Sequence, residues 1–94
     1  MVTKYYLTRY ATARERDQAR QRFHEANKDF QTAQFWGAGV SIYQQCEVET
    51  TLMNDGETDL GIMIFAPEEM FEKLVKSMRT SELFGTRIWE DKDG

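Results

Sequence analysis

The sequence predicts an α+β domain with the element order β-α-β-β-α-β, in which two helices cover one face of a four-stranded antiparallel sheet. Three observations support this prediction. Short stretches rich in aromatic and β-branched residues are typical of strands. Two segments carry apolar residues at helical spacing. Between two strand-like stretches, Asn54-Asp55-Gly56 has the composition of a hairpin turn.

The N-terminal third of the chain predicts a strand followed by a helix. Residues 3–10 (TKYYLTRY) are expected to form the strand. Thr12 and Glu15 have the spacing of a capping box, which starts the helix. Its apolar stripe runs to Trp36, and we expect a break or bend near residues 27–29. The reason is that an unbroken helix would be ~34 Å long, much longer than a ~20 Å strand. His24 is expected to face water.

The C-terminal two thirds predict a hairpin, a second helix and a last strand. Residues 40–53 and 58–66 are expected to pair around a three-residue loop at 54–56. This register pairs Thr50 with Leu60 and gathers the aliphatic side chains on one face, which is why we prefer it to a two-residue loop. Pro67 suits the first turn of the second helix. Residues 86–90 are expected to form the last strand.

Size, composition and charge limit what the protein can be. Its 94 residues, 40% of them hydrophobic, fit one domain spanning 1–94. One histidine and one cysteine are too few for a structural zinc site or an internal disulfide. No stretch reaches the ~20 apolar residues of a membrane span, and residues 1–10 lack the apolar core of a signal peptide. We therefore expect a cytoplasmic protein without a metal or other cofactor.

Charge is distributed unevenly along the chain. The net charge is −4, yet residues 1–28 carry seven bases and three acids. We interpret this segment as a solvated helix face in which acidic neighbours dilute the arginines. The alternative is a face that binds anions.

The predicted register places an unusual set of side chains on the sheet face away from the helices. Such a face is normally polar. Here it would carry six large aromatic or methionine side chains, an apolar patch that needs a cover. The full set is Lys4, Tyr6, Thr8, Tyr10, Ser41, Tyr43, Gln45, Glu47, Glu49, Gly61, Met63, Phe65, Arg87 and Trp89. A second copy of the sheet, single-stranded nucleic acid, or another partner or membrane surface would each cover it.

The element order, the length, the lack of Cys/His chemistry and the apolar open face resemble the dimeric α+β barrel superfamily of the ferredoxin-like fold. The resemblance covers essentially the whole chain and implies a homodimer with its two sheets face to face. It also implies a small aromatic or acyl-like ligand. Relatives include cofactor-independent monooxygenases, lactone isomerases, polyketide cyclases and haem-degrading enzymes. The haem-degrading branch supplies a histidine from the second helix, and residues 67–84 contain none. No catalytic residue is therefore carried over.

Candidate site residues come from the same predicted open face. Glu47 and Glu49 share one side of their strand. In a low-dielectric cavity one of them would act as a general acid or base beside Tyr43; the alternative is that both are simply solvated. We expect the ligand to be bound by Tyr6, Tyr10, Met63, Phe65, Arg87 and Trp89, although these side chains also suit a dimer interface or its rim.

Taken together, the sequence predicts a homodimeric protein that binds an apolar small molecule, with cofactor-independent monooxygenase or isomerase activity as an extension. The alternative is an open-sheet module that binds a protein or single-stranded nucleic acid. Nucleic acid is disfavoured because Glu47 and Glu49 would repel phosphate, and residues 60–66 contain no lysine or arginine to bind it.

Overall fold

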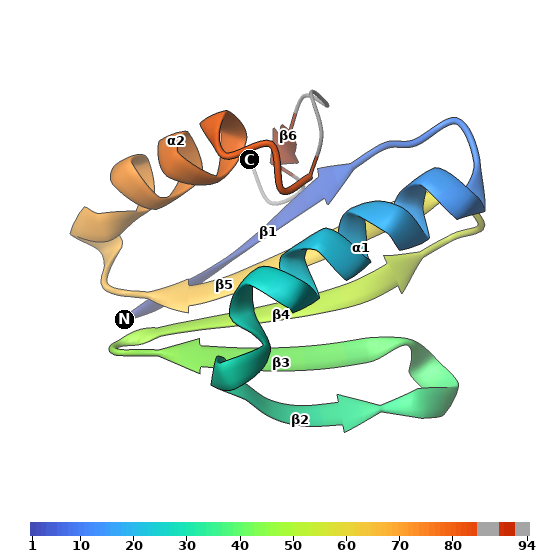
Figure 1. Cartoon of the computed structure of the whole chain (residues 1–94). Coiled ribbons are helices and arrows are strands. Elements are labelled where there is room, and N and C mark those ends of the chain that lie inside the picture. Colours follow the sequence, from blue (N-terminus) through green and yellow to red (C-terminus); the bar gives the residue numbers. More distant parts are fainter. Residues whose placement is uncertain (85–88, 92–94) are drawn as a thin grey trace.

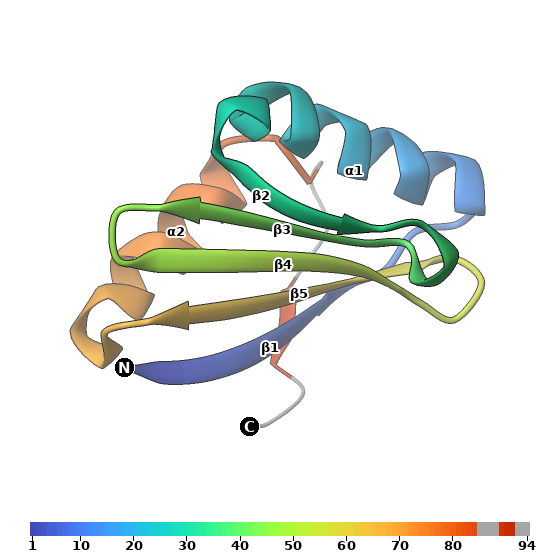
Figure 2. The same cartoon turned by 90° about the horizontal axis from the view of Figure 1, so that it is seen from below.

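The computed structural model describes residues 1–84 and the backbone of residues 89–91. Figures 1 and 2 show two helices on the same side of a twisted sheet. The helices are α1 (Ala13–Asn27) and α2 (Phe71–Thr80). The strands are β1 (Val2–Thr8), β2 (Gln31–Phe35), β3 (Val40–Gln45), β4 (Val48–Asp55), β5 (Asp59–Ala66) and β6 (Trp89–Asp91).

The sheet has the strand order β2-β3-β4-β5-β1-β6, and every neighbouring pair is antiparallel. The predicted four-stranded β-α-β-β-α-β arrangement is therefore wrong. Two segments account for the difference. Residues 31–35, expected at the end of a helix, form β2, and residues 40–53, expected as one strand, are split between β3 and β4.

A two-residue turn at Cys46-Glu47 makes this split. Gln45 pairs directly with Val48, and Cys46 adopts a φ of 56°, a left-handed conformation that few non-glycine residues take. Because side chains alternate along a strand, the reversal changes which residues share a face. Tyr43 pairs with Thr50 and faces the helices, whereas the prediction placed it on the opposite side.

The loop of the β4–β5 hairpin has three residues, as predicted, but it lies two residues further along the chain than predicted. Asp55 pairs with Asp59, and the loop is residues 56–58, with Gly56 in the left-handed region at φ 71°. Thr50 consequently pairs with Ile64 rather than with Leu60. An even shift of this kind leaves the side chains of β4 and β5 on their predicted faces, whereas Ile42 of β3 lies on the face opposite to the predicted one. The expectation that the aliphatic residues of β5 face the helices is confirmed.

Helix α1 begins as the sequence predicts. Thr12 Oγ1 accepts a hydrogen bond from the Glu15 amide at 3.2 Å, and a Glu15 carboxylate oxygen accepts one from the Ala11 amide at 3.2 Å. The helix ends at Asn27 and is followed by a 3-10 turn at Lys28–Phe30, where the sequence predicts a break. No helix resumes after it, because Gln31–Phe35 is a strand.

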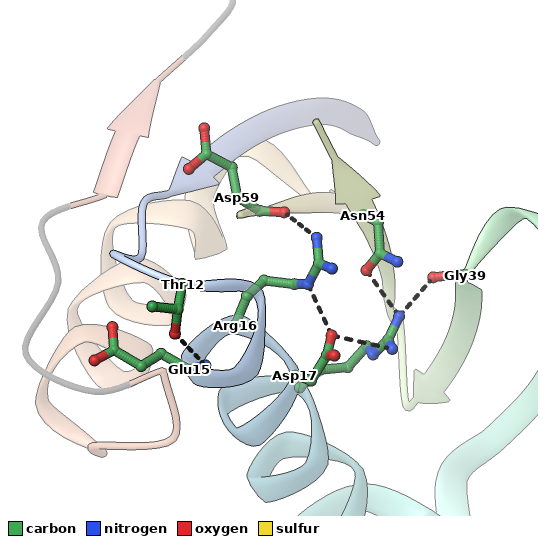
Figure 3. Close-up of polar contacts among 8 residues, drawn as sticks. Thr12, Glu15, Arg16, Asp17, Gly39, Asn54 and Asp59 are labelled. Atoms are coloured by element: carbon green, nitrogen blue, oxygen red, sulfur yellow. Dashed lines mark hydrogen bonds and ion pairs between the residues drawn. The ribbon is translucent and has the colours of Figure 1, made fainter. Parts of the chain in front are cut away.

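The arginines of α1 fasten the helix to the ends of the strands (Figure 3). Arg16, which is buried, donates to the Asp59 carbonyl at 3.2 Å and pairs with Asp17 at 2.8 Å. Arg20 donates to the Gly39 carbonyl at 3.1 Å and to Asn54 Oδ1 at 2.8 Å. Interpreting these two arginines as part of a solvated face is therefore wrong, because they are structural donors.

The core lies between the helices and one face of the sheet. The predicted stripe of α2 is confirmed, with Phe71 buried and Leu74, Val75 and Met78 packed against the core. Tyr6, Tyr10 and Tyr43 also lie in this core, so the prediction that they point away from the helices is wrong. The Phe23 ring meets Tyr43 edge-on and stacks on Phe84, and the Tyr10 hydroxyl donates to the Phe84 carbonyl at 2.7 Å. Neither helix in the described part of the chain is long and apolar enough to cross a bilayer.

Candidate functional site

The helix side of the sheet contains several pockets. One of about 640 Å³ lies beside α2 and is lined by Tyr6, Phe71 and Arg79 among others. Two others adjoin α1. The first of these two, called here the interhelical pocket, lies between α1, α2 and the strands beneath them and has a volume of about 360 Å³. Its lining is mostly apolar: Phe23, Asn27, Phe30, Tyr43, Gln45, Cys46, Val48, Thr50, Ile64, Met70, Leu74, Ser77, Met78 and Leu83. This volume lies in the range of small-molecule sites, ~300–1,000 Å³.

Strand register builds the floor of the interhelical pocket. Tyr43, Thr50 and Ile64 are direct neighbours across β3, β4 and β5. Their side chains point the same way because directly paired residues of antiparallel strands share a face. The floor therefore offers a phenol, a hydroxyl and an aliphatic side chain in one row, beneath the apolar stripe of α2.

The second pocket, called here the edge pocket, lies between α1 and the β2–β3 hairpin and has a volume of about 450 Å³. Figure 1 shows α1 lying over β4 and β5, so the hairpin extends beyond the helix at the edge of the sheet. The lining residues are Arg20, Gln21, His24, Glu25, Gln34, Phe35, Trp36, Gly39, Val40, Ser41 and Tyr43. This pocket is more polar than the first.

Tyr43 lines both pockets and is hydrogen bonded to His24. The Tyr43 hydroxyl lies 2.8 Å from His24 Nδ1, and it donates in the tautomer whose Nδ1 carries no proton. His24 is half-buried, so the expectation that it faces water is wrong. Burial raises the pKa of Tyr43, while a hydrogen bond with Ser41 and the positive charge of Arg20 oppose the shift. The phenol is therefore protonated at neutral pH.

The structure does not bring the predicted catalytic residues together. Glu47 is exposed in the turn between β3 and β4, whereas Tyr43 faces the core, and Glu47 lines neither pocket. Glu49 lies on the opposite face of the sheet, because it pairs with Phe65. The two glutamates therefore do not share a strand face.

The predicted ligand-binding residues are divided between the two faces of the sheet. Tyr6 and Tyr10 are buried in the core, while Met63 and Phe65 lie on the face without helices. Arg87 and the side chain of Trp89 lie outside the described residues.

Sequence reasoning missed His24, Trp36 and Ser41. No spacing identifies His24 as a site residue, because its position ~100° around the helix from Phe23 is that of a side chain facing water.

The sheet face without helices, called here the open face, is largely apolar. One row across five strands is Ala33, Ile42, Thr51, Met63 and Tyr5, each paired with the next. Two exposed aromatic side chains add to it, Phe35 at 56% and Phe65 at 41% of full exposure. Glu49, Asp55 and Asp59 supply acidic groups on this face.

Comparisons of the chain with protein-family models, with curated proteins and with solved structures give no match. Among the residues that the structure describes, no three His, Cys, Asp or Glu side chains are grouped so as to hold a metal ion. The interhelical pocket, the edge pocket and the open face are the candidate sites for a ligand or a partner.

Proposed function

We propose that the protein binds a small apolar molecule, aromatic or acyl-like, in the interhelical pocket. The observation that carries the proposal is the pocket itself, about 360 Å³ of space bordered by Phe23, Ile64 and Leu74. Filling it with a ligand removes apolar surface from water on both sides, which contributes ~25 cal/mol per Å² buried.

A polar group on the ligand has partners at the floor and rim. Thr50 presents a hydroxyl at the floor, and Asn27 and Ser77 present an amide and a hydroxyl from the two helices. None of these groups is charged, so a carboxylate or a phenol forms a hydrogen bond there without charge repulsion. The ligand class is therefore an apolar body with one polar end.

The test is to measure binding of dodecanoate and of 2-naphthol by calorimetry to the wild type and to two matched variants. Ser77 lines the pocket, so Ser77→Trp places an indole in it and is expected to weaken binding at least ~10-fold, or ~1.4 kcal/mol. Lys73 is exposed on the same helix and does not line the pocket. Lys73→Trp is therefore expected to bind as the wild type does. Equal affinity in both variants, or no binding to the wild type, would contradict the proposal.

The proposal also includes self-association through the open face. Its apolar row and the exposed Phe35 and Phe65 make a surface of the kind that a partner covers. Glu49, Asp55 and Asp59 disfavour nucleic acid there, because they repel phosphate. A second copy of the chain supplies the same apolar row and closes the pair by two-fold symmetry.

Light scattering on a sizing column tests the self-association. We expect a dimer for the wild type and a monomer for Met63→Lys, because a buried unpaired charge at the centre of the interface costs several kcal/mol. Gln18→Lys adds the same charge to an exposed position of α1 and is expected to leave the dimer intact. A wild type that is monomeric throughout would overturn the proposal and favour docking of a different protein on this face.

A further inference from the structure

We propose that the edge pocket is a second binding site, and that its ligand is a neutral, flat heterocycle of the nucleobase class. The inference does not rest on the interhelical ligand, because the edge pocket has its own walls on α1 and the β2–β3 hairpin. Three features of its lining define the ligand class: an exposed indole, a set of neutral hydrogen-bonding groups, and offsetting charges.

Trp36 supplies a surface for stacking. Its side chain is 84% exposed, so it adds little to the core, yet it lines the pocket. The turn that carries it, Trp36–Ala38, is closed by a hydrogen bond of 3.3 Å from the Gly39 amide to the Trp36 carbonyl, with Gly39 at φ 64°. This backbone geometry fixes the position of the Trp36 backbone, from which the indole projects. Flat rings stack on such exposed aromatic faces regardless of their substituents.

The hydrogen-bonding groups read the edge of such a ring. Gln34 offers an amide donor and a carbonyl oxygen that also accepts from Gln31 Nε2 at 3.2 Å. His24 keeps Nε2 for a ligand while its Nδ1 bonds Tyr43, and the Ser41 hydroxyl, which also bonds Tyr43, has a lone pair left to accept. Ser41 is buried, and the Tyr43 hydrogen bond orients His24. Mixed donors and acceptors match the edge of a nitrogen heterocycle, which alternates the two kinds of group.

The charges disfavour an anion. In the described part of the chain, Arg20 is the one arginine or lysine of the pocket, and its Nη1 already donates to Gly39 and Asn54. Asp17 lies 3.6 Å from its Nη2, and the Glu25 carboxylate lines the same pocket. An anionic ligand would thus meet a guanidinium already engaged and a carboxylate that repels it.

The experiment titrates nicotinamide and adenosine into the isotope-labelled wild-type protein and follows amide and indole signals by NMR. We expect shifts that map to α1 residues 20–25 and to residues 34–41, with benzoate binding more weakly than nicotinamide. Trp36→Ala removes the stacking surface and is expected to lower the affinity for both probes at least ~5-fold. Gln34→Leu removes the hydrogen bonds to the edge of the ring and is expected to weaken binding of both probes as well. Gln18→Ala, at an exposed position of α1 away from the pocket, is expected to leave both affinities unchanged.

Three results would overturn the inference: no shift at this pocket with either probe, unchanged affinity in Trp36→Ala, or benzoate binding as tightly as nicotinamide. Because Ser77→Trp blocks only the interhelical pocket, it is expected to leave nicotinamide affinity unchanged. A result that contradicts binding in the edge pocket is therefore distinguishable from one that contradicts binding in the interhelical pocket.

Discussion

On the open face, the Tyr5 side chain lies across Gly61 and reaches Asp55. The Tyr5 hydroxyl donates to Asp55 Oδ2 at 2.7 Å, and a Cβ added at Gly61 would come within 2.7 Å of Tyr5 Cζ. The glycine therefore makes room for a ring that covers the sheet, as aromatic residues do beside glycines in other sheets. Burial raises the pKa of Tyr5, and the hydrogen bond to Asp55 and the charges of Asp55 and Asp59 raise it further.

This pKa shift predicts a loss of stability at alkaline pH. The folded state holds the Tyr5 proton above pH 10, where the unfolded chain releases it, so the stabilisation is complete below that pH and is lost as pH rises. One such proton contributes a slope of at most ~1.4 kcal/mol per pH unit. Urea unfolding from pH 8 to pH 11 is expected to show a shallower decline for Tyr5→Phe than for the wild type. Parallel curves would contradict this assignment.

Cys46 carries a positive φ without being a glycine. At φ 56° its Cβ crowds the backbone, so Cys46→Gly is expected to raise the free energy of unfolding by ~0.5–1 kcal/mol. Cys46→Ser removes the thiol but keeps the Cβ, and is expected to unfold like the wild type. Chemical denaturation of the three proteins measures both effects, and equal gains in the two variants would attribute the effect to the thiol instead.

At the scale of elements, the arginines of α1 connect the helix to strand ends that lie far away in the sequence. Arg16→Ala removes a buried donor to the Asp59 carbonyl and is expected to lower the free energy of unfolding by ~1.5–3 kcal/mol. Arg14→Ala changes an exposed arginine of the same helix and is expected to stay within ~0.5 kcal/mol. Urea unfolding measures both variants. A similar loss in the two would indicate that removing any arginine from this helix, rather than losing the Arg16 contact, is responsible.

The elements also show what the sequence can and cannot predict. The cap at Thr12, the stripe of α2 and the inward face of β5 follow from local patterns, because each depends on neighbours in the chain. The turn at Cys46-Glu47 lacks the glycine that usually marks a hairpin, so no local sequence signal predicts it. Missing that one turn changed the predicted strand count and reversed the assigned face of Tyr43.

The first strand and the candidate site were ambiguous for a related reason. Tyr5 and Tyr6 are adjacent aromatics, so alternation along the strand fits either phase. Only the pairing of Tyr6 with Ile62 decides that Tyr6 faces the core. His24 and Trp36 become site residues through contacts between α1 and the β2–β3 hairpin. Such contacts depend on how the elements pack, and no spacing in the sequence records them.

At the scale of the whole molecule, one sheet face is covered by two helices and the other carries an apolar row. If two copies of the chain cover each other's open faces, as proposed above, association stabilises each copy and the thermal stability of the protein depends on its concentration.

Calorimetry at several protein concentrations measures this dependence. If two copies cover each other, the melting temperature is expected to rise by several degrees between ~5 and ~200 µM, because association stabilises the folded state by mass action. Met63→Lys is expected to melt at one temperature throughout. A wild-type melting temperature that does not change with concentration would contradict the pairing of open faces.

The outer strand β2 limits how copies of the protein can add to one another. Its register with β3 shifts between Gln31 and Ala33, and Thr32 Oγ1 there donates to the Ile42 carbonyl at 3.4 Å. The strand is only five residues long and leads directly into the turn that carries Trp36. A short, irregular border is a poor template for another strand. Strand addition at β2, which would build open-ended polymers, is thus disfavoured.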